Sequence, residues 1–98
     1  MSNKKNVAVL GAGVMGTGIA QLFASKGYPV TIIYVYDDIV RAKPLETMQE
    51  NLKILCDNDV MREDEIPLIL ENVTCTEDME AAAKSADIIF ECIVEDLA

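Results

Sequence analysis

The chain alternates between short runs rich in apolar and β-branched residues and longer segments whose apolar residues recur every three or four positions. The short runs lie at 6–10, 30–36, 73–76 and 87–94. Their length and composition predict strands, and the first and last of them predict strands buried on both faces of a sheet. The longer segments predict helices with one apolar face. The predicted order is therefore β-α-β-α-α-β-α-β.

Glycine, proline and aspartate mark several expected helix boundaries. The first helix follows the glycines at 11–16 and should end at Gly27, where a residue without a side chain can stop it. A helix begun at Asp38 should be interrupted at Pro44, and Pro44 suits the first turn of the next helix. The remaining helices are expected at 63–70 and 78–84, the first with Pro67 near its start.

Strands that alternate with helices predict a parallel sheet with right-handed crossovers. The fold class is α/β, a Rossmann-type doubly wound sheet, and four strands make only its first half. We therefore expect residues 1–98 to form one dinucleotide-binding domain that is truncated after the fourth strand. The first strand should be central, flanked by the second and the fourth, with the third beyond the second.

Charge narrows the classes of partner. The formal net charge is −9, which argues against nucleic acid and against an anionic membrane surface. No apolar run approaches the length of about 20 residues that crosses a bilayer, so we expect no membrane. A nucleotide remains possible, because backbone N–H groups can hold phosphates without net positive charge.

Cysteine and histidine bear on compartment and chemistry. Cys56, Cys75 and Cys92 have no paired spacing, so we expect reduced thiols, a cytoplasmic location and no metal site. The start of the chain is polar and does not look like a signal peptide. The chain has no histidine, the commonest general acid–base near neutral pH.

The segment Gly11 to Gly16 matches G-x-G-x-x-G, and it lies between a predicted strand and a predicted helix. Gly11 permits the tight turn, Gly13 lets a pyrophosphate approach the backbone, and Gly16 lets the helix pack close to the strand. The helix start offers free N–H groups to the phosphates, and Gly18 should add a further close contact. The alternative is a glycine-rich turn that binds nothing. The candidate cofactor-binding residues are Gly11, Ala12, Gly13, Val14, Met15 and Gly16.

An acid at the end of the second strand is the other element expected of such a site. Its carboxylate would accept hydrogen bonds from the adenine ribose and favour NAD over NADP, whose phosphate it repels. Asp37 is the candidate, with Asp38 in reserve. The alternative role for this acid is a helix cap.

Two stretches together resemble the N-terminal domain of the L-3-hydroxyacyl-CoA dehydrogenases, a family that includes the 3-hydroxybutyryl-CoA dehydrogenases. The first runs from Val7 to Gln21 and includes M-G-x-G-I-A-Q at residues 15–21. The second runs from Asp87 to Leu97 and looks like the family's D-hhh-E-x-hhE-x-L segment, where h is apolar. The resemblance extends along essentially all of the chain.

The resemblance implies an NAD-binding domain followed by a helical domain that dimerises. The implied reaction is reversible oxidation of a 3-hydroxyacyl-CoA to a 3-ketoacyl-CoA, with hydride passed to NAD. Gly11, Gly13 and Gly16 would then lie at the pyrophosphate. Further along the chain, Cys92 and Ile93 would lie beside the cofactor through their backbone, and Glu95 would approach the nicotinamide ribose. The alternative for Glu95 is a solvated acid at a strand end.

The sequence departs from the family pattern in two places. Counting forward from Gly16 by the family's usual spacing lands on Tyr34, so Asp37 reaches the ribose only if a bulge re-aims it. The family's catalytic His–Glu pair, and its substrate-positioning Ser and Asn, come later in the chain than Ala98. We therefore expect no catalytic residue and no independent activity here, and acyl-CoA binding only together with a helical C-terminal domain.

Two alternatives to an enzyme's cofactor domain stay open. The chain could be a stand-alone nucleotide-binding subunit, or a structural remnant without catalytic activity. In all of these cases residues 88–90 lie in a strand whose outer neighbours in the family sheet are lacking. An unpaired apolar edge of this kind predicts self-association.

Overall fold

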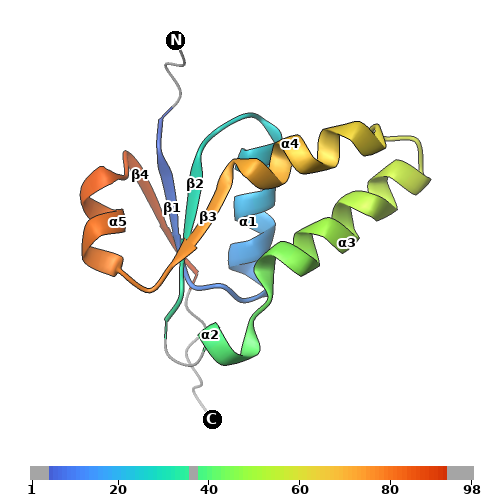
Figure 1. The fold of residues 1–98 in the computed structure, drawn as a ribbon. Coiled ribbons are helices and arrows are strands. Elements are labelled where there is room, and N and C mark those ends of the chain that lie inside the picture. Colours follow the sequence, from blue (N-terminus) through green and yellow to red (C-terminus); the bar gives the residue numbers. More distant parts are fainter. Residues whose placement is uncertain (1–4, 36–37, 93–98) are drawn as a thin grey trace.

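The computed structural model describes residues 5–35 and 38–92. It contains one sheet of four parallel strands in the order β3-β2-β1-β4. The strands are β1 (Val7–Leu10), β2 (Val30–Ile33), β3 (Val73–Thr76) and β4 (Ile88–Glu91). The predicted fold class and strand order are confirmed (Figure 1).

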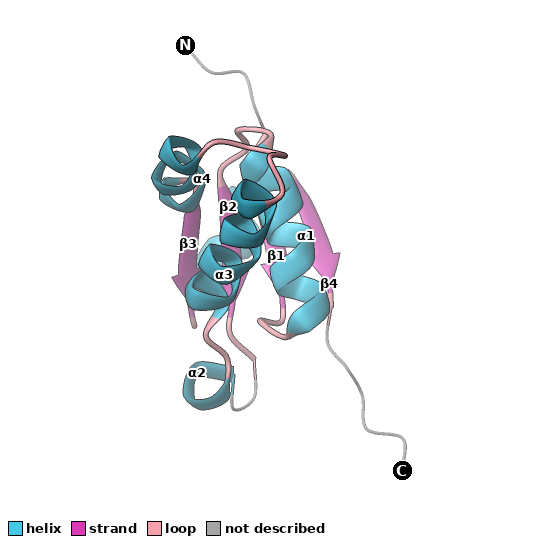
Figure 2. Ribbon diagram, turned by 90° about the vertical axis from the view of Figure 1, so that its right-hand side faces the viewer, coloured by secondary structure: helices cyan, strands magenta, loops and turns pink. Residues whose placement is uncertain are grey.

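The helices form a layer on each side of this sheet. They are α1 (Val14–Ser25), α2 (Asp38–Arg41), α3 (Pro44–Asp57), α4 (Ile66–Glu71) and α5 (Met79–Ser85). Figure 1 shows α5 on one side and α1, α3 and α4 on the other, and Figure 2 looks onto the second side. None of the helices in the described part of the chain is long and apolar enough to cross a membrane.

The strands are paired so that their ends are level. Val7 lies opposite Val30 and Ile88, and Val30 lies opposite Val73. All four strands are four residues long, so their carboxyl ends meet along one short edge. That edge is where parallel α/β sheets bind ligands.

Small residues bring the helices close to the sheet. On the α1 side, the strand residues Val7, Val9 and Ile32 pack with Ala20 and Ala24, all of them at most 1% exposed. On the α5 side the buried cluster is smaller and consists of Ala8, Ile33 and Ala82. Alanine on α1 allows close helix–sheet packing, because it presents only a methyl group to the β-branched side chains.

Three boundaries differ from the sequence-based expectation or refine it. The second strand was expected to reach Tyr36 but ends at Ile33, because the carboxylate of Asp38 accepts the N–H of Val35 and turns the chain (2.9 Å). Helix α2 ends before Pro44, as predicted. The helix expected from Glu63 instead begins as a 3₁₀ turn, and α4 follows it.

The glycines confirm two of the assigned roles and contradict a third. Gly11 has φ 108°, a conformation that side chains disfavour. A Cβ added at Gly16 would collide with the carbonyl oxygen of Gly11 and lie 3.3 Å from Val9 Cγ1. The further close contact expected at Gly18 is wrong, since a Cβ there meets nothing within 4 Å.

Substitutions at Gly16 and Gly18 of α1 form a matched pair that tests how closely this helix packs against β1 and the turn after it. We expect Gly16→Ala to lower the free energy of unfolding by at least about 2 kcal/mol, because the methyl group must displace backbone. Gly18→Ala should raise it by roughly 0.5–1 kcal/mol through helix propensity alone. Urea denaturation measures both, and equal effects would contradict the assigned packing.

Candidate functional site

The loop between β1 and α1 presents backbone N–H groups at the carboxyl edge of the sheet. Gly13 is the N-cap of α1, is extended (φ −74°, ψ −167°) and provides no side-chain cap. The first N–H groups of a helix have no partners within it, so they remain available here. A Cβ at Gly13 would meet nothing within 4 Å, so an anion can approach the backbone closely.

Hydrogen bonds within the protein hold this loop in place. The N–H of Gly11 donates to Ile33 O on the neighbouring strand (2.9 Å). The hydroxyl of Thr17 donates to Ala12 O (3.2 Å), and Thr17 is only 3% exposed. The N–H groups at the start of α1 are therefore pre-oriented, which lowers the entropy lost on binding.

Asp38 is the acid that the structure brings to the glycine-rich loop. Its Oδ2 accepts the N–H of Ala12 (3.0 Å) as well as that of Val35. Both bonds use the same oxygen, and no hydrogen bond to Oδ1 occurs in the described part of the chain. Asp37, the first candidate from the sequence, lies outside the described residues. The register of Asp38 could not be read from the sequence because it depends on how the chain turns after β2.

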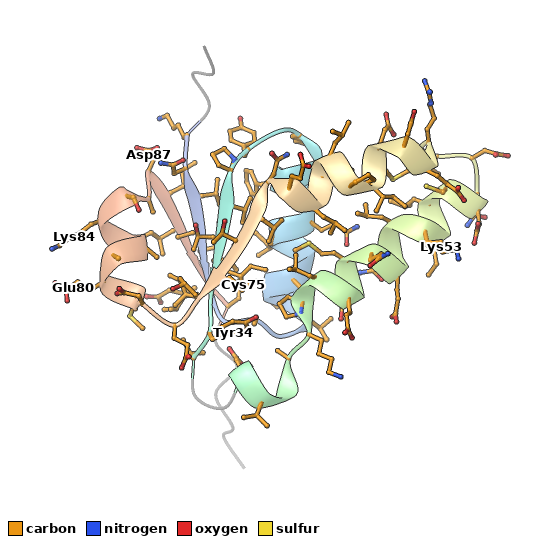
Figure 3. All side chains as sticks on the ribbon, viewed as in Figure 1. Tyr34, Lys53, Cys75, Glu80, Lys84 and Asp87 are labelled. Atoms are coloured by element: carbon orange, nitrogen blue, oxygen red, sulfur yellow. The ribbon has the colours of Figure 1, made fainter. Side chains whose placement is uncertain are left out.

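The residue that directly follows β2 is Tyr34. Its side chain packs against the buried cluster, as does that of Cys75 on the neighbouring strand β3 (Figure 3). Burial raises the pKa of Tyr34 to about 12, with further contributions from Cys75 and from the carboxylates of Asp38 and Glu77. Burial also raises the pKa of the Cys75 thiol. Near neutral pH, β2 is therefore followed by an uncharged side chain.

A pocket of about 300 Å³ lies between the glycine-rich loop and the start of α3, and we call it the loop pocket. This volume lies at the lower end of the range for small-molecule sites, ~300–1,000 Å³, and fits part of a dinucleotide. Lys43 and Thr47 belong to it, although sequence reasoning missed them because no motif marks them. The lining residues are Ala12, Gly13, Val14, Thr17, Asp38, Ala42, Lys43 and Thr47.

The end of β4 lies beside the same loop. Cys92 is buried, and its N–H donates to Leu10 O (2.8 Å). That N–H is therefore engaged, and a backbone contact from Cys92 to a ligand falls to its carbonyl. Ile93 and Glu95, predicted to line the cofactor, lie outside the described residues.

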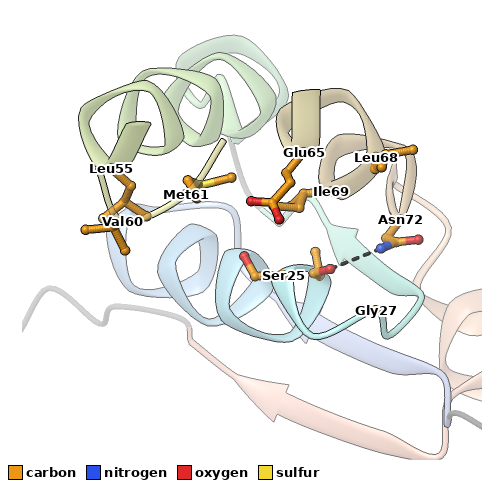
Figure 4. Close-up of a pocket in the computed structure, with 10 residues that line it drawn as sticks. Ser25, Gly27, Leu55, Val60, Met61, Glu65, Leu68, Ile69 and Asn72 are labelled. Carbon is orange, nitrogen blue, oxygen red and sulfur yellow. Dashed lines mark hydrogen bonds between the residues drawn. The ribbon is translucent and has the colours of Figure 1, made fainter. Parts of the chain in front are cut away.

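A larger pocket of about 440 Å³ lies at the other end of α1, between that helix and the hairpin of α3 and α4 (Figure 4). Asn72 borders it and donates from Nδ2 to Ala24 O (3.0 Å). Its walls are mostly apolar and lack the free helix N–H groups of the glycine-rich loop, so the smaller pocket is the better nucleotide site. Within the described residues, no group of three His, Cys, Asp or Glu side chains could hold a metal ion.

Residues 6–98 match the family model described as the NAD-binding domain of 3-hydroxyacyl-CoA dehydrogenase. The chain is 32% identical to the mitochondrial hydroxyacyl-coenzyme A dehydrogenase of Rattus norvegicus, over 95% of this chain and 31% of that protein. It resembles the crystal structure of (S)-3-hydroxybutyryl-CoA dehydrogenase PaaH1 from Ralstonia eutropha, with 28% identity and a TM-score of 0.83 over 96% of this chain and 32% of that one. FadB2 of M. tuberculosis is similar, with 27% identity and a TM-score of 0.83 over 97% of this chain and 33% of that one. The chain thus spans about a third of the length of these relatives.

The raised pKa of Tyr34 makes the stability of the folded protein depend on pH. The folded pKa of about 12 exceeds the unfolded value of about 10, so the stability that the phenol contributes is complete below about pH 10 and lost as pH rises towards 12. A phenolate absorbance titration, read after a pH jump and before unfolding, should show one group at about 12 in the wild type that is missing from Tyr34→Phe. A difference titration centred near 10 would contradict the burial of the phenol.

Proposed function

The chain belongs to the 3-hydroxyacyl-CoA dehydrogenase family, as its NAD-binding domain, and from this we propose that the loop at residues 11–16 holds NAD for hydride transfer between 3-hydroxyacyl-CoA and 3-ketoacyl-CoA. The observation that carries the proposal is the uncapped start of α1 at Gly13. NAD, when bound, accepts or returns the hydride. The residues described here bind and orient it.

The pyrophosphate is assigned to the N–H groups at the start of α1. An anion there gains from the helix dipole as well as from hydrogen bonds, which explains how a chain of net charge −9 can bind a charged cofactor. Val14 and Met15 are 92% and 64% exposed, and bound cofactor would cover part of this apolar surface. We expect binding in the high-micromolar to millimolar range, about −4 to −6 kcal/mol.

The ribose contact is assigned to Asp38. Its carboxylate lines the same pocket as Gly13 and is fixed through Oδ2, which leaves Oδ1 to accept a ribose hydroxyl. Asp37 stays a prediction of the dinucleotide-binding pattern, and Ile93 and Glu95 stay predictions of the family resemblance. The 3-hydroxyacyl-CoA substrate is proposed from the names of the relatives, and no catalytic residue is assigned within residues 5–35 and 38–92.

We also propose a cytoplasmic location. The three cysteines are free thiols, which suits a reducing compartment. Subcellular fractionation tests this proposal, and recovery with an oxidising compartment or a membrane fraction would contradict it.

Self-association is proposed from the edge strand β4. Among the residues that the structure describes, it pairs with β1 on one side and with no strand on the other. Phe90 packs on Phe23 of α1, with ring centroids 5.3 Å apart, whereas its neighbour Ile89 points to the α5 face and is 49% exposed. An edge strand with an exposed apolar side chain favours pairing with a second copy.

The phosphate assignment can be tested with Gly13→Val. A Cβ at Gly13 meets nothing within 4 Å, so we expect the variant to fold while the isopropyl group occupies the space assigned to the pyrophosphate. We expect ADP-ribose binding, measured by calorimetry, to be lost. Gly18→Val is the matched control, because its site on α1 is equally open but faces away from the loop pocket. If Gly13→Val binds as well as the control, the glycines form only a structural turn.

The proposal that β4 mediates self-association can be tested by sedimentation. We expect the wild type to associate at tens of micromolar, about the range in which exposed edges commonly do so. Ile89→Lys should shift the protein towards monomer, since an edge lysine opposes strand pairing. A wild type that stays monomeric throughout this range would refute self-association.

A further inference from the structure

The loop pocket is lined by two residues of opposite charge. Among the described residues that line it, only Asp38 and Lys43 are charged. Lys43 immediately precedes α3 and is exposed to solvent. A lysine acts on a phosphate as a point charge, while a carboxylate repels it.

The residue that follows β2 makes no charge contribution to this choice. In a dinucleotide-binding sheet this position is expected to hold the acid that selects NAD. Here Tyr34 occupies it, and its phenol carries no charge near neutral pH. Among the described residues of the pocket, the charges that can select between the two cofactors are therefore those of Asp38 and Lys43.

Asp38 can supply only part of that selection. Its Oδ2 already accepts two backbone N–H groups, from Ala12 and Val35, and these dipoles offset some of its negative potential. Lys43 lines the same pocket and brings a charge of opposite sign to it.

We propose that Lys43 is a specificity-determining residue, which supports a ribose 2′-phosphate against Asp38 and makes the preference for NAD over NADP modest. This inference rests on the proposed function of the loop and adds to it the residue pair that sets cofactor choice. Thr47, one turn into α3, provides a hydroxyl in the same pocket that can donate to a phosphate oxygen.

The test compares ADP-ribose with 2′-phospho-ADP-ribose by calorimetry on the intact chain. We expect the wild type to prefer ADP-ribose by less than about tenfold. Lys43→Gln should raise that preference by about fivefold or more, the scale of one charge acting through a partly solvated site. Asp38→Asn should reverse it, because asparagine keeps an acceptor oxygen for the loop N–H while losing the charge.

Lys53→Gln is the matched control, since it removes an equal charge further along the exposed side of α3 (Figure 3). It should leave the preference unchanged, and the effect of Lys43→Gln should shrink at high salt. If the wild type binds ADP-ribose but Lys43→Gln and Lys53→Gln show the same preference, the role of Lys43 is wrong and the proposed function stands. If the wild type binds neither ligand, the proposed function itself fails.

Discussion

The absence of a side chain at Gly16 sets the distance between α1 and β1, and the rest of the site depends on that distance. The carbonyl oxygen of Gly11 occupies the space that a Cβ would need. With this approach fixed, Ala20 and Ala24 meet Val7 and Val9 without a gap, and the helix starts at the sheet edge rather than beyond it. The N–H groups to which we assign the pyrophosphate are thus placed by a packing constraint in the core.

A second constraint ties the loop to the strand beside it. The carboxylate of Asp38 joins the N–H of Ala12 to that of Val35, so one side chain both ends β2 and steadies the glycine-rich turn. An acid with two structural bonds is available for ligand contact only through its remaining oxygen. The proposed ribose contact would therefore share one residue with the structure of the loop, and a substitution of Asp38 would affect both unless an acceptor is kept.

The sequence predicts the sheet order and the glycine-rich loop because both follow from local patterns, namely short β-branched runs and a motif whose spacing is fixed by backbone geometry. It does not predict that Asp38 reaches the loop, because the position of this side chain depends on its hydrogen bonds to Ala12, which is distant in sequence, and to Val35. Gly18 was misjudged because motif position says nothing about which face of α1 it occupies. Lys43 and Thr47 were missed because the pocket they line forms only when α3 folds back towards α1.

Because the start of α1 has no side-chain cap, the stability of the domain also depends on whether a ligand is bound there. Helix N–H groups that lack a side-chain acceptor must be satisfied by water in the free protein, and Gly13 supplies none. A ligand that fills this place binds only the folded chain and adds about 2.7 kcal/mol at 100 times its dissociation constant. At the high-micromolar to millimolar dissociation constant proposed above, a dinucleotide present at that concentration adds only about 0.4 kcal/mol, so the dinucleotide pool would change the folded fraction only slightly.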